Sequence, residues 1–183
     1  SAFDHCGIKN ITLPDGLITL DKMAFYNSSL KTIEISDSVT SIGESAFAYC
    51  VGLTDVKLPA SLTTVENGLF MNSTNLKAIE IPDGVTAIKG GAFYSCRSLE
   101  SVNIPDGVTK ISGSVFYGCS KLESVSLPEN TTEISSEAFY NCSSLTSITI
   151  PNNVPSIGEY TFYGCKSLEK VLTKEEALGN KYI

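Results

Sequence analysis

The sequence predicts a solenoid, a β-rich rod in which each repeat of about 23 residues adds short strands to a parallel sheet and makes one short helical turn. All eight phenylalanines form one series with gaps of 22 or 23 residues: Phe3, Phe25, Phe47, Phe70, Phe93, Phe116, Phe139 and Phe162. The six cysteines keep the same period, each three residues after a phenylalanine: Cys6, Cys50, Cys96, Cys119, Cys142 and Cys165. Two residue types in one register along the whole chain indicate a repeat protein.

The unit over residues 82–104 contains the residues that predict each element of the repeat. Its two stretches V-T-A-I and L-E-S-V-N-I are rich in β-branched residues and predict strands. Val102 and Ile104 are two residues apart, so they lie on one face of a strand. Pro82 ends the preceding strand because it lacks a backbone donor, and the Asp-Gly pair after it favours a turn. The A-F-Y-S-C segment between the two stretches predicts one helical turn.

A unit of this size cannot enclose its own apolar face, so stability comes from stacking on the neighbouring units. We expect the core to be built from two ladders of equivalent residues: Phe47, Phe70, Phe93, Phe116, Phe139 and Phe162, with Cys96, Cys119, Cys142 and Cys165. The pattern predicts a single solenoid domain of about eight repeats over residues 1–172, the first truncated, and a C-terminal cap or exit segment over 173–183. Thr131 replaces the valine of one repeat, which predicts looser packing there.

Cysteines and acidic turns raise the question of disulfides and metals. A cysteine spacing of 23 residues or more matches no zinc signature. Equivalent residues of stacked strands lie about 4.8 Å apart, farther than the Cβ separation of about 3.8 Å in a disulfide. A buried thiol ladder, with cysteine as a small apolar filler, is the favoured interpretation. The recurring turn carboxylates of Asp15, Asp37, Asp83, Asp106 and Glu129 suit turns without a metal, and calcium binding there stays open.

The consensus P-x-x-V-T-x-I-x-x-x-A-F-x-x-C-x-x-L-x-x-V-x-I resembles the BspA-type leucine-rich repeat, and the match runs from residue 1 to about 172. The resemblance implies a leucine-rich-repeat solenoid wound as a right-handed superhelix. It also implies secretion to the cell surface and adhesion to host proteins or other cells.

Charge and composition exclude several classes of function. The net charge of −7 argues against nucleic acid as a partner and against docking on anionic membranes. Apolar runs are only a few residues long, so no segment is expected to insert into a membrane. His5 is the only histidine, which leaves no Ser-His-Asp or Cys-His arrangement with a partnered base. The sequence therefore predicts a protein that is not an enzyme and uses no cofactor.

Two sets of residues are candidates for binding. The first set points outward from the strand of each L-x-x-V-x-I stretch, opposite the core: Asp55, Lys57, Glu80, Ser101, Asn103, Ser124 and Ser126. The second set follows the phenylalanines and includes Tyr94, Tyr117 and Tyr140. These tyrosines form either an aromatic strip that stacks on sugars or partner side chains, or a half-buried ladder that covers the edge of the core. A solvated sheet would show the first pattern as well.

Taken together, these features predict a non-enzymatic, secreted or cell-surface recognition or adhesion module. It would bind host or partner proteins through the outward strand face, and a glycan stays open as a ligand. The alternative is a passive stalk that displays another domain and has no ligand of its own.

Overall fold

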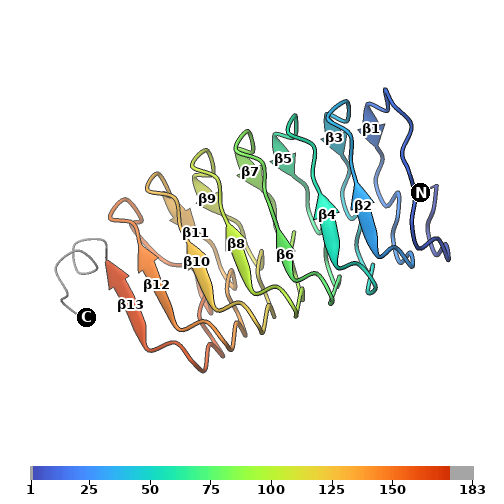
Figure 1. Ribbon diagram of the computed structural model, residues 1–183. Helices are drawn as coiled ribbons and strands as arrows, with labels where there is room; N and C mark the ends of the chain where they lie inside the picture. The colour runs from blue at the N-terminus through green and yellow to red at the C-terminus, as the bar shows by residue number, and fades with distance from the viewer. Residues whose placement is uncertain (1, 174–183) are drawn as a thin grey trace.

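The computed structural model describes residues 2–173 and shows a rod of stacked turns, the predicted solenoid (Figure 1). Most turns contribute two strands, one to each of two rows that run along the rod, whereas the turn that begins with β12 has only an isolated bridge at Ile157 in the back row. The front row consists of β2 (Thr32–Glu34), β4 (Asp55–Lys57), β6 (Ala78–Ile79), β8 (Ser101–Asn103), β10 (Ser124–Ser126), β12 (Ser147–Ile150) and β13 (Lys170–Thr173). The back row consists of β1 (Thr19–Leu20), β3 (Ser41–Ile42), β5 (Thr64–Val65), β7 (Ala87–Ile88), β9 (Lys110–Ile111) and β11 (Glu133–Ile134). Most of the segment predicted as a cap, residues 174–183, lies outside the described residues.

Every strand pair is parallel and joins residues one repeat apart. Val102 pairs with Val125, as predicted, and Ile148 pairs with Val171. The front row is divided into three ladders, β2–β4, β6–β8–β10 and β12–β13, instead of forming one continuous sheet. Within residues 2–173, β4 and β6 share only an isolated bridge between Lys57 and Glu80. These interruptions shape the surface of the front row.

The predicted helical turn is wrong: residues 2–173 contain no helix. In every repeat from Phe25 onward, the residues two before and two after the phenylalanine have positive φ, as Gly91 (62°) and Ser95 (55°) do around Phe93. Such residues cannot continue a right-handed helix. The amides of Gly91, Phe93 and Ser95 instead donate to carbonyls of the next turn, at 2.6–3.1 Å. The segment is thus a third hydrogen-bonded row along the rod. No helix of the described chain could therefore span a membrane.

The core contains the phenylalanine ladder. Phe25 to Phe139 are fully buried, and successive rings stack with centroids 5.1–5.7 Å apart and planes within 15° of parallel. Phe3 and Phe162, at the two ends, are only partly buried.

The side chain three residues after the phenylalanine, usually a cysteine, donates a hydrogen bond in addition to filling space in the core. The sequence pattern does not reveal this bond. The Cys119 thiol donates to the carbonyl of Phe93 in the preceding turn at 3.1 Å. The thiols of Cys50, Cys96, Cys142 and Cys165 likewise donate to phenylalanine carbonyls of the preceding turn, those of Phe25, Phe70, Phe116 and Phe139. Ser73 occupies the slot in one repeat, and its hydroxyl donates to Phe47 at 2.7 Å. Serine can replace cysteine at Ser73 because both side chains donate to the buried carbonyl of the preceding turn.

We expect the thiols to differ in reactivity by position. Burial raises the pKa of Cys96, Cys119 and Cys142, so these thiols should stay protonated and unreactive toward a thiol reagent at pH 8. Cys6 and Cys165 are partly exposed and should react first. After denaturation without reductant all six should titrate, and fewer than six would reveal disulfides. In the unfolded chain these thiols ionise near pH 8.5, below their pKa values in the folded chain. Ionisation therefore favours the unfolded chain in alkaline solution, so the free energy of unfolding is unaffected at neutral pH and falls as the pH rises above about 8.5.

Thr131 is completely buried, and its hydroxyl has no hydrogen-bond partner among residues 2–173. The cost at this position is an unsatisfied polar group, in a slot that holds Val108 in the preceding repeat. Thr131→Val should therefore raise the free energy of unfolding by about 1–2 kcal/mol in urea melts. Thr132→Val is the control, because the Thr132 hydroxyl is exposed and donates to Thr109. A loss of stability in Thr131→Val would show that the hydroxyl is satisfied.

Candidate binding face

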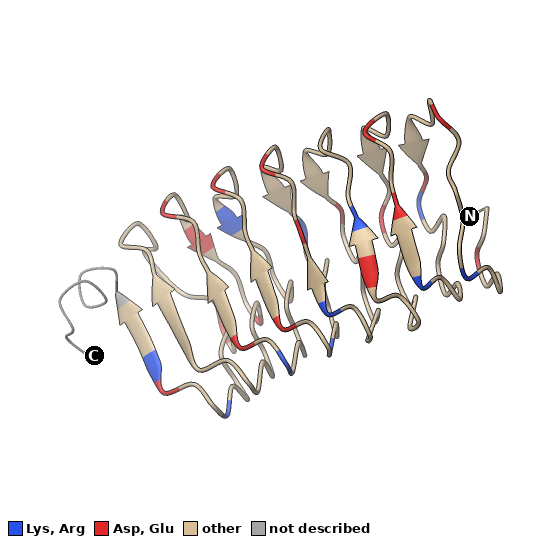
Figure 2. Cartoon of the chain, in the orientation of Figure 1, with Lys and Arg blue, Asp and Glu red and all other residues tan. Residues whose placement is uncertain are grey.

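The outer surface of the front row carries every strand residue predicted for binding. Asp55, Lys57, Glu80, Ser101, Asn103, Ser124 and Ser126 are all exposed. They project outward because they alternate with buried residues, as Val102 lies between Ser101 and Asn103. Charged residues lie on β2 and β4, whereas β8, β10 and β12 carry none (Figure 2). We call this surface the front face.

The charges of the front face are unevenly satisfied. The Lys57 ammonium forms an ion pair with Glu34 of the preceding turn, and this hydrogen bond and attraction raise the pKa of Lys57. Asp55 and Glu80, in contrast, take part in no ion pair with any residue that the structure describes. The front face therefore presents carboxylates that nothing within the described chain neutralises.

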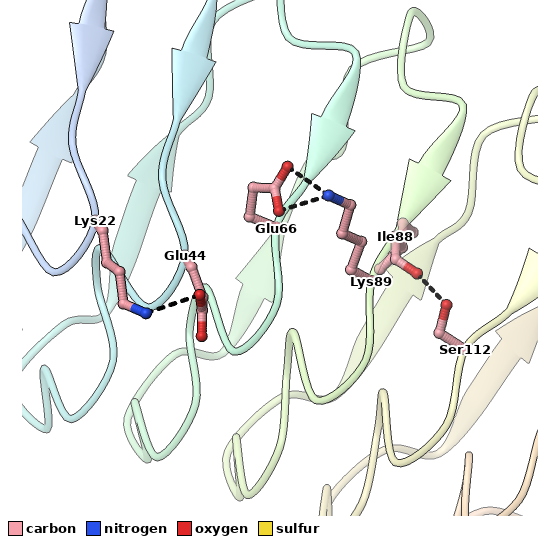
Figure 3. Close-up of polar contacts among 6 residues, drawn as sticks. All are labelled: Lys22, Glu44, Glu66, Ile88, Lys89 and Ser112. Atoms are coloured by element: carbon pink, nitrogen blue, oxygen red, sulfur yellow. Dashed lines mark hydrogen bonds and ion pairs between the residues drawn. The ribbon is translucent and has the colours of Figure 1, made fainter.

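Along the back row, three pairs of charges bridge adjacent turns. Lys22 bonds Glu44 at 2.9 Å and Lys89 bonds Glu66 at 2.8 Å, in each case across one turn (Figure 3). Lys110 bonds Glu133 at 2.8 Å, which lowers the pKa of Glu133. Ser112 donates to the Ile88 carbonyl at 2.6 Å. These six charges on or just beyond the back row, a surface we call the back face, are thus paired with one another, whereas Asp21 and Glu159 beside them have no ion pair with a described residue.

Tyr94, Tyr117, Tyr140 and Tyr163 stack on one another, with centroids 4.5–4.9 Å apart and planes within 22° of parallel. Tyr94, Tyr117 and Tyr140 are half-buried, as the ladder interpretation predicts. Their stacking leaves little ring face for a sugar, so the edges and hydroxyls are what the ladder offers. Burial and the neighbouring phenols raise the pKa of Tyr117 and Tyr140, so both hydroxyls stay protonated at neutral pH.

The remaining candidates are dispersed. Asp37 accepts a hydrogen bond from the Ala60 amide at 2.7 Å, which joins two adjacent turns. Nowhere in residues 2–173 do three His, Cys, Asp or Glu side chains gather in a group that could hold a metal ion. His5 is exposed beside Asp4 and next to the ring of Tyr26.

Two hollows of the front face lie where strand pairing is interrupted. One, of about 630 Å³, lies over β4 and β6 and is lined by Asp55, Ala78 and Glu80 among others. The other, of about 260 Å³, lies between β10 and β12 and is lined by Ser126 and Thr149. Neither interruption follows from the repeat pattern, so neither hollow could be predicted from the sequence.

Comparisons with known proteins agree on the architecture. A family model described as the BspA type leucine rich repeat region matches residues 1–98 and 86–180, in six copies. A leucine-rich cell-surface protein from Faecalibacterium prausnitzii A2-165 is 32% identical with a TM-score of 0.81, over 91% of this chain and 46% of that one. The leucine-rich repeat protein TpLRR of T. pallidum is 31% identical with a TM-score of 0.80, over 85% of this chain and 74% of that one.

The pneumococcal vaccine antigen PcpA shares the fold at 21% identity, with a TM-score of 0.51 over 93% of this chain and 58% of its own. No curated protein matches the sequence. The chain spans less than half the length of the Faecalibacterium protein.

Proposed function

Because the chain belongs to the BspA-type leucine-rich repeat family, we propose that it is a non-enzymatic recognition module that binds a protein partner through its front face. Leucine-rich repeat proteins of this kind generally serve in protein interaction or as scaffolds. The cell-surface description of the Faecalibacterium relative supports a place outside the cell, as part of a secreted or surface-displayed protein.

The observation that carries this proposal is the contrast between the two rows. Back-face charges such as Lys22 and Lys89 are engaged in ion pairs with the neighbouring turn. On the front face, Asp55 and Glu80 have no ionic partner among the described residues. A face that is regular, exposed and without a role in the core is where a repeat protein places its contacts. An interface of standard size covers about 800 Å² per partner, so contacts have to extend over several repeats.

A triple variant tests the proposal. The full chain is applied to an array of purified extracellular proteins and glycans, and the proteins it binds are tested again with Lys57→Ala, Glu80→Ala and Asn103→Ala combined. The variant should lose about tenfold or more in affinity, while its melting temperature stays nearly unchanged because all three side chains are exposed.

The control combines Lys110→Ala, Glu133→Ala and Thr132→Ala, which make the same charge changes on the back face. It should leave affinity unaltered. An array without any bound protein would favour the passive stalk. Binding lost on adding a chelator would move the site to the acidic turns, and binding carried only by glycans would contradict protein recognition.

A further inference from the structure

We propose that the hollow over β4 and β6 receives a segment of the protein partner that carries lysine or arginine, an inference that rests on the function proposed above. The hollow lies at the point where the front-row ladder is interrupted, with the isolated Lys57–Glu80 bridge as its only strand pairing among the described residues. It is larger than the second hollow, between β10 and β12, about 630 Å³ against 260 Å³.

Two alanines that depart from the repeat pattern line the hollow. Ala78 occupies the outward slot that holds Asp55 in the turn before and Ser101 in the turn after, and it is exposed. Ala60 occupies the turn slot that holds Asp37 and Asp83 in the adjacent repeats. Both positions have a smaller side chain than their neighbours, so the front face is lowered over two adjacent turns.

The charge of the lining identifies the occupant. Four carboxylates line the hollow: Asp37, Asp55, Glu80 and Asp83. The one cation in the lining, Lys57, is already paired with Glu34. Three of these carboxylates, those of Asp55, Glu80 and Asp83, have no ion pair or hydrogen bond with a described residue. A cationic side chain would complement them, and cations of a partner steer its approach to such a surface.

The apolar part of the lining suits the stem of the same side chains. Ala60 and Ala78 are exposed and present methyl groups to the hollow, whereas the side chains of Val56 and Ile79 face the core and contribute only backbone to the lining. Lysine and arginine bury their aliphatic stems along apolar surface while the charged head reaches polar groups. A metal ion would gain nothing from these methyl groups, and no group of three candidate ligands occurs within residues 2–173.

The test uses the full chain and an acetylated, amidated hexalysine peptide, followed by amide NMR shifts. Shift changes should concentrate on residues 55–60 and 78–84. Ala78→Lys places an ammonium of the chain in the hollow and should weaken peptide binding about tenfold. Thr132→Lys makes the same charge change at an exposed residue beside the back row and should weaken it less than about twofold, as general attraction predicts.

A second pair of variants guards against misfolding of Ala78→Lys. Glu80→Gln with Asp83→Asn should weaken binding, whereas Glu100→Gln with Glu123→Gln, exposed carboxylates elsewhere, should not. Equal losses in each matched pair, shifts spread over all acidic turns, or the same shifts on adding calcium alone would overturn the proposal. If a protein bound on the array still binds Ala78→Lys with full affinity, this hollow is not its binding site, and the proposed function still stands.

Discussion

Replacing Phe116 by alanine should lower the free energy of unfolding by about 3–5 kcal/mol. The Phe116 ring is completely buried and stacks at 5.5 Å on Phe93 on one side and at 5.5 Å on Phe139 on the other. The substitution leaves a cavity between two turns that the backbone hydrogen bonds hold at fixed separation, so the site cannot collapse. Urea melts followed by circular dichroism measure the loss.

Phe3→Ala is the matched control, since Phe3 occupies the same slot at the end of the stack. Its ring stacks at 5.1 Å on Phe25 alone among the described residues and is only partly buried. Less apolar surface is lost and the remaining space is open to solvent, so we expect a loss of about half that of Phe116→Ala or less. Equal losses at the two positions would contradict a stack stabilised by contacts between neighbouring turns.

The period alone was enough to predict the stack and its two surfaces. Because equivalent residues are spaced by one repeat, Val102 had to face Val125 in a parallel ladder, and the alternation along the strand then placed Ser101 and Asn103 outside. These conclusions need only the geometry of a strand and the demand that apolar residues be buried. Every outward residue predicted for binding is accordingly exposed.

Features that depend on backbone dihedrals or on neighbouring turns could not be read from one repeat. The A-F-x-x-C segment has helix-like apolar spacing, yet every second amide bonds the next turn and the amides between them bond the carbonyl three residues before. The sequence did contain a sign of the positive φ angles. The position two residues after the phenylalanine holds asparagine or glycine in five repeats, at Asn27, Asn72, Gly118, Asn141 and Gly164, and these are the residues that favour positive φ. The pairing of Lys57 with Glu34 and the interrupted ladder at β6 depend on side-chain reach and local strand separation, which the repeat pattern does not encode.

Gly43→Ala should lower the free energy of unfolding by about 1–3 kcal/mol through overpacking. Gly43 follows β3, and its amide donates to the Leu20 carbonyl at 2.7 Å. A Cβ atom at Gly43 would lie 2.4 Å from the backbone nitrogen of Lys22. The atoms that would have to move belong to the backbone of the adjacent turn, so the substitution separates two turns that hydrogen bonds hold together.

Gly84→Ala separates this steric effect from the general effect of removing a glycine. A Cβ atom there meets nothing closer than 3.6 Å, an ordinary contact. Alanine also restricts the unfolded chain, so Gly84→Ala should be neutral or stabilising by up to about 1 kcal/mol. The urea concentration at the midpoint of unfolding should therefore fall for Gly43→Ala and stay the same or rise for Gly84→Ala. If Gly43→Ala unfolds at the same urea concentration as the parent chain, adjacent turns can part without cost. The short distance between the backbones at Gly43 and Lys22 would then not require a glycine at position 43.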